Sequence, residues 1–418
     1  MPDRIVVVGH SAVTCLGRDM DSTWEGLVSG RSGLRRRESL RADVFQQSIA
    51  GFVDGLGPGT DAEDPAVSRL PARSLHLAMR AARDAWNDAG LDERPDLDRD
   101  RVALAIGSAF GGLDLLDAEV ARAAQRKGLT TSPYLVPGMI INQSAGQVAQ
   151  HLKLYGPSIA PANACASGGH AAIIAALLLR GGEADFALCG AAESAFTGPI
   201  VNGFATMKAL FNRKDDRASD DPSQASRPFS GDRAGFVLSE GAAMLVLATE
   251  SAARRLGLPI QAELLGWSWN SDGYHMAMPD GARVSKCLAA ALARSGATPE
   301  EIDYYNAHGT STVVNDKAET AALKEVFGPR AATLPVSSIK GALGHALGAA
   351  SAIEAAVCVR ALRAQAIPPT INYRPDPDLD LDYVPNLSRP AALRTVMSAS
   401  FGFGGTNNAL VFRRWTDD

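Results

Sequence analysis

One cysteine stands where a reactive thiol would be placed. Cys165 lies among small residues in NACASGGHAA, where an apolar run gives way to a long predicted helix. At the first turn of a helix, free backbone N–H groups and the helix dipole favour the thiolate, and the thiol pKa falls from about 8.5 to roughly 3.5–7.5. Cysteine is also among the residues most often buried as a small apolar filler. Cys165 is therefore either a nucleophile or a packing residue.

Two histidines and a lysine lie in stretches that are typical of site loops. His308 follows the predicted strand IDYYN in NAHGTST, and Lys340 and His345 lie in the glycine-rich stretch SSIKGALGHALGAA. A lone histidine there is usually structural, but the chain has only seven histidines, and two of them with a lysine at strand ends favour a site. The turn SFGFGGTNNA is dense enough in glycine to bring backbone N–H groups close to a bound oxygen. These partners favour the nucleophile over the packing residue for Cys165.

The segments that must position these residues alternate between strand and helix. Residues 4–13 and 101–110 are short apolar runs that are typical of strands buried on both faces, and a helix is predicted over 73–90 between them. The same alternation returns in residues 185–194, 236–249, 302–312, 333–343 and 395–414. The sequence therefore predicts a layered α/β protein.

Two helices that are apolar almost all round divide the chain into similar halves. They are predicted over 168–182, after Cys165, and over 346–365, after His345. A helix without a polar face is buried between layers, so each is expected in the middle of its half. We place the division between residues 1–258 and 259–418, and we expect a polar surface loop over 210–235.

Composition and charge exclude several classes of protein. The 418 residues are 46% hydrophobic and include 40 glycines, which indicates one compact core rather than a disordered chain. The five cysteines have neither disulfide-framework nor zinc-ligand spacing, so no metal is expected. A net charge of −5 gives no basic field for nucleic acid or an anionic membrane. No apolar run approaches the roughly 20 residues of a membrane span, and we expect a cytoplasmic protein.

The four motifs NACASGGHAA, NAHGTST, SSIKGALGHALGAA and SFGFGGTN occur in order, and with them the chain resembles the elongating β-ketoacyl-acyl carrier protein synthases. The resemblance implies a thiolase fold, in which two βαβαβαββ halves stack as a five-layer α-β-α-β-α sandwich. It also implies a homodimer and a decarboxylative Claisen condensation in fatty acid or polyketide synthesis. No cofactor is implied, because the substrates are carried on the phosphopantetheine of an acyl carrier protein.

The resemblance also implies roles for the site residues. Cys165 would hold the acyl chain as a thioester, and His308 and His345 would assist loss of carbon dioxide from malonyl and stabilise the enolate. The backbone N–H groups of Cys165 and Phe403 would hold the acyl oxyanion. Lys340 would contribute positive charge and position, paired with Glu354.

Further residues follow from the same resemblance. Thr310 and Thr312 would bind the phosphopantetheine arm, and Phe403 would gate an acyl pocket. That pocket would be lined by Phe110, Ile200 and Phe204, with Phe110 near the dimer axis and limiting chain length. The candidates for docking an acidic carrier protein are the basic residues Arg69, Arg73, Arg126, Lys127 and Lys208.

Two departures from the family pattern bear on the pathway. NDKAET follows HGTSTVV where housekeeping synthases commonly have GDKAE, and this variant is similar to ketosynthases of specialised polyketide pathways. Ala277 stands where a threonine is common, so one pantetheine contact is missing. The alternatives are a ketosynthase subunit or non-catalytic chain-length partner of a heterodimer, and a Cys-His acyltransferase or hydrolase. Chain-length partners typically lack the cysteine, and a simple acyltransferase needs neither the second histidine nor Lys340.

Overall fold

The computed structural model describes residues 3–40, 47–57, 59, 65–92, 94–125, 131–211, 218 and 220–416. One ten-stranded sheet, in the order β10-β9-β13-β14-β8-β1-β7-β6-β4-β5, carries both halves of the fold. The strands of the first half are β1 (Ile5–Val13), β4 (Val102–Gly107), β5 (Ser158–Ile159), β6 (Phe186–Glu193) and β7 (Gly241–Thr249). Those of the second half are β8 (Ala262–Ser271), β9 (Tyr304–Asn306), β10 (Val336–Ser337), β13 (Thr395–Gly402) and β14 (Thr406–Arg414).

The two halves repeat one strand order. Counted along the chain within each half, both sets run third, second, fourth, fifth, first across the sheet. The first three of these strands are parallel, and the last two are joined by antiparallel pairing. A short antiparallel contact between β1 and β8, at Val6–Glu263 and Val7–Ala262, connects the halves. The division at residues 258 and 259 stays a prediction.

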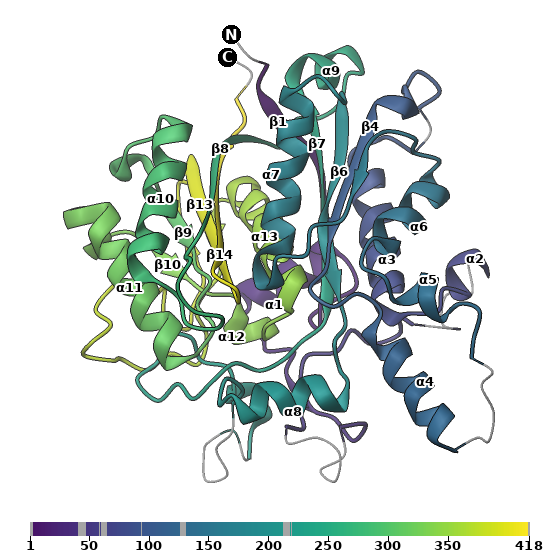
Figure 1. The fold of residues 1–418 in the computed structure, drawn as a ribbon. Coiled ribbons are helices and arrows are strands. Elements are labelled where there is room, and N and C mark those ends of the chain that lie inside the picture. Colours follow the sequence, from purple (N-terminus) through teal and green to yellow (C-terminus); the bar gives the residue numbers. More distant parts are fainter. Residues whose placement is uncertain are drawn as a thin grey trace.

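Helices cover both faces of each half-sheet (Figure 1). In the first half they are α1 (Met20–Val28), α2 (Pro65–Ser68), α3 (Arg73–Asp88), α4 (Leu113–Gln125), α5 (Leu135–Met139), α6 (Gln143–Leu152), α7 (Ser167–Arg180), α8 (Gly198–Thr206) and α9 (Glu250–Arg255). In the second half they are α10 (Gly281–Ser295), α11 (Val313–Phe327), α12 (Lys340–Leu343) and α13 (Ala350–Ala364). Figure 1 shows α3 and α6 outside one half-sheet, α10 and α11 outside the other, and α7 and α13 between them. The predicted five-layer thiolase fold is confirmed.

The two apolar helices lie where the sequence predicts, in the middle layer. Nearly every residue of α13 is buried, and α7 reaches the surface only in its last turns, around Leu177. Small side chains let the two helices approach closely: a Cβ added at Gly168 would lie 2.5 Å from the backbone nitrogen of Ala352. This packing brings the starts of both helices together.

Two local predictions are wrong. Within residues 333–343 the strand is only the two-residue β10, and Lys340, expected in a glycine-rich turn, begins the short helix α12. Residues 225–230 are buried rather than part of a surface loop. Their polar groups find partners inside the protein: Arg227 donates to the carbonyl of Asp232, and the Phe229 ring stacks on Tyr383. Two two-stranded sheets, β2 (Arg35–Arg36) with β3 (Ile49–Ala50) and β11 (Ala366–Ile367) with β12 (Arg389–Pro390), complete the strands. Among the described residues, no helix has the length and apolar character needed to cross a bilayer.

Candidate active site

Cys165 lies on a sharp turn between β5 and α7. A short 3₁₀ turn, Ala164–Ala166, precedes the helix, and Ala164 has a left-handed φ of 49°. A non-glycine residue in this region costs about 1–3 kcal/mol and persists only where its surroundings impose it, which is frequent at functional sites. The turn leaves Cys165 8% exposed, just before the middle-layer helix α7. The sequence signal for a nucleophile therefore coincides with local backbone strain.

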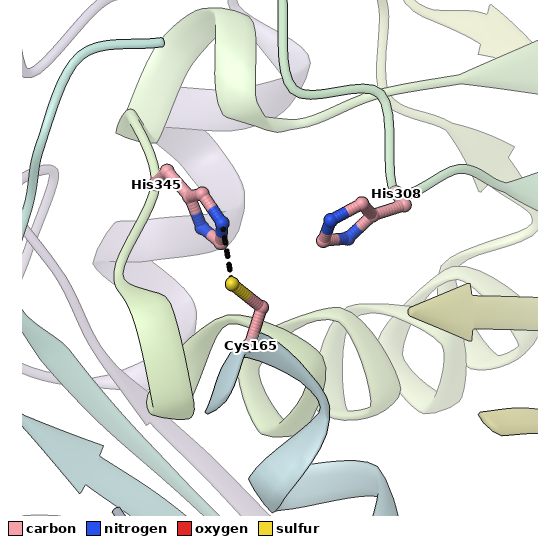
Figure 2. A group of neighbouring side chains, drawn as sticks. All are labelled: Cys165, His308 and His345. Atoms are coloured by element: carbon pink, nitrogen blue, oxygen red, sulfur yellow. Dashed lines mark hydrogen bonds between the residues drawn. The ribbon is translucent and has the colours of Figure 1, made fainter. Parts of the chain in front are cut away.

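His345 contacts the sulfur of Cys165. Its Nε2 lies 3.1 Å from the Cys165 Sγ (Figure 2). The backbone of His345 is fixed on both sides, because its N–H donates to the Val237 carbonyl at 2.7 Å and its carbonyl accepts from the Ser239 N–H at 3.0 Å. Among the described residues, its Nδ1 has no hydrogen-bond partner. The loop before α13 thus presents one imidazole edge to the thiol.

His308 faces the same point from the end of β9 (Figure 2). The centroids of the His308 and His345 rings are 5.5 Å apart and nearly perpendicular, at 85°. The ligand atoms of Cys165 and the two histidines all lie within 4.8 Å of one another. The backbone N–H groups of His308 and Gly309 each donate to the buried carboxylate of Glu319 at 2.8 Å. Glu319, on α11, therefore positions the His308 turn.

Lys340 joins His308 to α13. Its ammonium donates to the His308 carbonyl at 2.6 Å and lies 3.5 Å from the His308 Nδ1. It also forms an ion pair with Glu354, whose other oxygen accepts from the Ser400 hydroxyl at 3.0 Å. Both charged side chains are at least 98% buried, so each charge is balanced mainly by the other. The structure contains the expected Lys340–Glu354 pair, which fixes Lys340 beside His308.

The protonation of the site differs from the expectation for a cysteine at a helix start. Burial raises the pKa of the Cys165 thiol to about 12, although the charge of Lys340 and the N–H of Phe403 act in the opposite direction. Burial and the charge of Lys340 hold the pKa of both histidines well below the ordinary value. The predicted lowering of the thiol pKa is wrong because the dry surroundings outweigh the stabilising charges. At rest the site holds a neutral thiol and two neutral imidazoles.

A cavity of about 830 Å³ opens onto these three side chains. Its wall includes Phe110, Phe204 and Phe403 from the predicted acyl pocket and gate, and Thr310 and Thr312 from the predicted pantetheine arm. The Phe204 ring lies 6.2 Å from that of Phe403, centroid to centroid. Ile200 does not line the cavity, but it packs against the apolar cluster that contains Cys165. The cavity is large enough for a long apolar chain beside a polar arm.

The basic residues predicted to dock a carrier protein are not equivalent. Arg69 and Lys208 are exposed, and Lys208 lies at the cavity wall. Arg73 donates to the buried Glu240 carboxylate at 2.7 Å and to the Val53 carbonyl at 2.6 Å, so its guanidinium holds the fold together instead of facing a partner. Arg126 and Lys127 lie outside the described residues.

Several residues that contact the site were not predicted from the sequence. Phe236 and Phe401 pack edge-on against the rings of His345 and His308, with centroids 5.3 and 5.5 Å away. Glu319 could have been found, because it follows His308 by eleven residues and lies three residues after Asp316 on a helix. The two phenylalanines carry no comparable signal, since each is an ordinary apolar residue in a strand-like run.

The chain is similar to known proteins over nearly its whole length. Residues 2–253 match the family "Beta-ketoacyl synthase, N-terminal domain" and residues 261–374 match "Beta-ketoacyl synthase, C-terminal domain". A 3-oxoacyl-[acyl-carrier-protein] synthase 2 of Coxiella burnetii is 38% identical over 417 residues, 99% of both chains. The tetracenomycin polyketide synthase ketoacyl synthase alpha subunit of Streptomyces glaucescens is 37% identical and covers 98% of this chain and 97% of its own. The ishigamide ketosynthase/chain length factor structure aligns over 100% of both chains with a TM-score of 0.89 and 32% identity.

Proposed function

We propose a reaction course for this chain, which belongs to the β-ketoacyl synthase family. The chain is a β-ketoacyl-ACP synthase, an acyltransferase of fatty acid or type II polyketide synthesis. The observation that carries the proposal is the convergence of Cys165, His345 and His308 on one cavity. An acyl chain enters that cavity as a thioester of an acyl carrier protein.

The first half-reaction transfers the acyl group to Cys165. The sulfur attacks the thioester carbonyl, the Cys165 proton passes through His345 Nε2 at 3.1 Å to the leaving sulfur of the carrier, and the carrier departs as a free thiol. The N–H groups of Cys165 and Phe403 donate hydrogen bonds to the carbonyl oxygen and stabilise the negative charge that develops on it. Because the resting thiol has a raised pKa, the proton must leave as the new bond forms.

The second half-reaction makes the carbon–carbon bond. Malonyl on a second carrier loses carbon dioxide, and the electron pair of the broken bond forms an enolate. Neutral His308 and His345 donate N–H groups to the enolate oxygen, where they stabilise charge without carrying it themselves. The enolate carbon attacks the acyl carbonyl, the bond to sulfur breaks, and the Cys165 thiolate takes up one proton from solvent.

The proposed reaction course uses the three residues for acyl transfer and decarboxylation. The reaction needs no cofactor beyond the phosphopantetheine of the substrate carriers. Thr310 and Thr312, whose hydroxyls lie 2.9 Å apart at the cavity wall, bind that arm. Phe403 gates the acyl branch, and Phe110 and Phe204 line it. Lys340 and Glu354 hold His308.

The partner is an acyl carrier protein, and the assembly is a dimer of two copies or of this chain with a related one. The assembled Cys165, His308 and His345 support the active member of any such pair, because a chain-length partner needs no nucleophile. Lys208 and Arg69 remain the described candidates for docking. The cytoplasmic location stays a prediction.

The proposal is tested by intact-mass measurement of acylation with a ladder of acyl-carrier thioesters. The wild-type chain gains one acyl group, and Cys165→Ala gains none. His308→Ala still becomes acylated, whereas His345→Ala is acylated more slowly because it lacks the imidazole that carries the Cys165 proton. Both variants lose decarboxylation of malonyl-carrier by at least about 100-fold, because each removes an N–H donor to the enolate. Labelling of the alanine variant at residue 165 would refute the nucleophile, and full condensation by either histidine variant would refute that histidine's role.

A further inference from the structure

Glu193 is a buried carboxylate beside the site that the reaction course does not use. It is the last residue of β6, has no exposed surface, and lies next to the end of the parallel strand β4. Glu193 forms no ion pair with any residue that the structure describes. Burial raises the pKa of Glu193 to about 7, because hydrogen bonds replace only part of its lost hydration. A buried carboxylate without a paired cation is stabilised by its hydrogen-bond donors alone, so the contact between Glu193 and its donors calls for an explanation.

The donors to Glu193 come from two segments that meet at the cavity. On one side, the Ser108 hydroxyl donates at 3.0 Å, the Ala109 N–H at 2.6 Å, and the Phe110 N–H also donates. On the other side, the Gly348 N–H donates at 3.3 Å. Ala109 and Phe110 line the acyl cavity. Gly348 follows His345 by three residues.

The junction is tight enough to transmit the position of one segment to the other. A Cβ added at Gly348 would lie 2.6 Å from the Ala109 nitrogen and 2.7 Å from a Glu193 oxygen, so no side chain fits there. Leu347, the neighbouring residue at the cavity wall, has a left-handed φ of 46°. A strained non-glycine residue keeps this conformation only while its surroundings hold it. The Glu193 carboxylate is the group that bridges the two sides.

We propose that Glu193 is a positioning residue that fixes the Ser108–Phe110 turn of the acyl cavity against the His345 loop, and thereby sets which acyl chains reach Cys165. The proposal rests on the proposed function, since it assigns a determinant of acyl selectivity to the same site. All four groups that face Glu193 are donors, and an ionised carboxylate offers only acceptors to them. A glutamine would turn its NH₂ group, which is itself a donor, toward some of these donors. Either the Ser108–Phe110 turn or the Gly348 segment would then lose its hydrogen bonds to residue 193.

The test compares Glu193→Gln with Glu263→Gln. Glu263 is also a buried carboxylate, but it pairs with Arg413 on the outer part of β8 and β14. Acylation of Cys165 is measured in the full chain on thioesters from butyryl to palmitoyl, together with thermal unfolding. For E193Q, we expect the ratio of rates between preferred and poorest chains to fall at least about tenfold, and the KM for the preferred acyl donor to rise while the KM for malonyl-carrier stays unchanged. E263Q should lose stability without changing the ratio.

A second measurement distinguishes the loss of the Glu193 contacts from a general loosening of the fold. Iodoacetamide should still alkylate E193Q once, at Cys165, and at least as fast as wild type, because the negative charge of Glu193 raises the Cys165 pKa. A loosened chain would react at more than one of its five cysteines, all of which are buried.

If E193Q does not fold, Gly348→Ala serves instead, because it keeps the carboxylate and separates its partners. A folded E193Q or G348A that keeps the selectivity ratio within about twofold of wild type overturns the proposal. Failure of the wild-type chain to become acylated by any thioester would instead overturn the proposed function on which it rests.

Discussion

At the residue scale, the chemistry depends on keeping charge away from the cavity until substrate arrives. Cys165 is a thiol and both histidines are neutral, although Lys340 lies within 3.5 Å of one of them. Lys340 itself is balanced by Glu354. The buried ion pair therefore fixes the geometry of His308, while the reacting groups stay uncharged. Such a site loses little solvation energy when a long apolar chain fills it.

The raised thiol pKa makes a prediction about pH. Below its pKa, the thiolate fraction of a cysteine grows tenfold with each pH unit, and a pKa of about 12 lies far above the working range. The rate of Cys165 alkylation by iodoacetamide should therefore rise about tenfold per unit from mildly acidic to mildly alkaline pH, without a plateau. Intact mass over time measures it, with Cys165→Ala as the blank. A plateau near neutral pH would mean that the N–H groups and dipole at the helix start lower the pKa of the Cys165 thiol more than burial raises it.

At the element scale, the site is made where the two central helices begin. Cys165 lies two residues before α7 and His345 lies five residues before α13, so the distance between the helices sets the distance between sulfur and imidazole. The helices are held close by residues without bulk, and Gly168 is the tightest of these positions. Packing of α7 on α13 therefore sets the geometry of the Cys165–His345 contact.

Gly168→Ala should destabilise the protein, because the new Cβ would lie 2.5 Å from the Ala352 nitrogen and 2.6 Å from its Cβ. Overpacking of this kind costs about 1–3 kcal/mol, and it would also widen the contact between Cys165 and His345. Thermal unfolding and the acylation rate measure the two effects. Gly203→Ala on α8 is the matched control, since nothing lies within 4 Å of a Cβ added there. Equal stability of the two variants would contradict tight packing of α7 on α13.

At the scale of the whole molecule, one edge of the sheet is open. β5 ends the sheet, both of its residues are exposed, and Ile159 is 46% exposed. Tyr134 and Val136, before and in α5 on the same half, are more exposed still, at 66% and 65%. Open edges with apolar surroundings favour pairing with another chain.

We expect the chain to form a dimer that uses this edge. Light scattering should give twice the chain mass of 43.8 kDa. Ser158→Pro should shift the population toward monomer, because the register of β5 on β4 turns the Ser158 N–H away from the sheet and proline removes that donor. Ser158→Ala, which preserves the backbone donor, is the control. A wild-type chain that stays monomeric alone and pairs only with a related chain would favour the heterodimer. A proline variant that stays fully dimeric would place the interface elsewhere.

The sequence was sufficient for the fold class and for the residues that the structure brings together at the cavity, but not for the protonation of the site. Cys165, His308, Lys340 and His345 lie in local motifs whose residue types already indicate chemistry. The two central helices follow from composition alone, since they lack a polar face. The pKa of Cys165 could not be predicted, because burial depends on side chains from both halves. Glu193 was missed for a related reason, since its donors lie 84 and 155 residues away.

The separation of Cys165 from His345 in the chain has a consequence for biosynthesis. The two residues whose side chains touch are 180 residues apart. At about 5–20 residues per second, the ribosome delivers the thiol roughly 10–35 s before the imidazole that must accept its proton. During that interval the nascent chain carries a cysteine without its catalytic partner. The contact between Cys165 and His345 therefore forms only after translation has passed His345 and α13 has docked on α7.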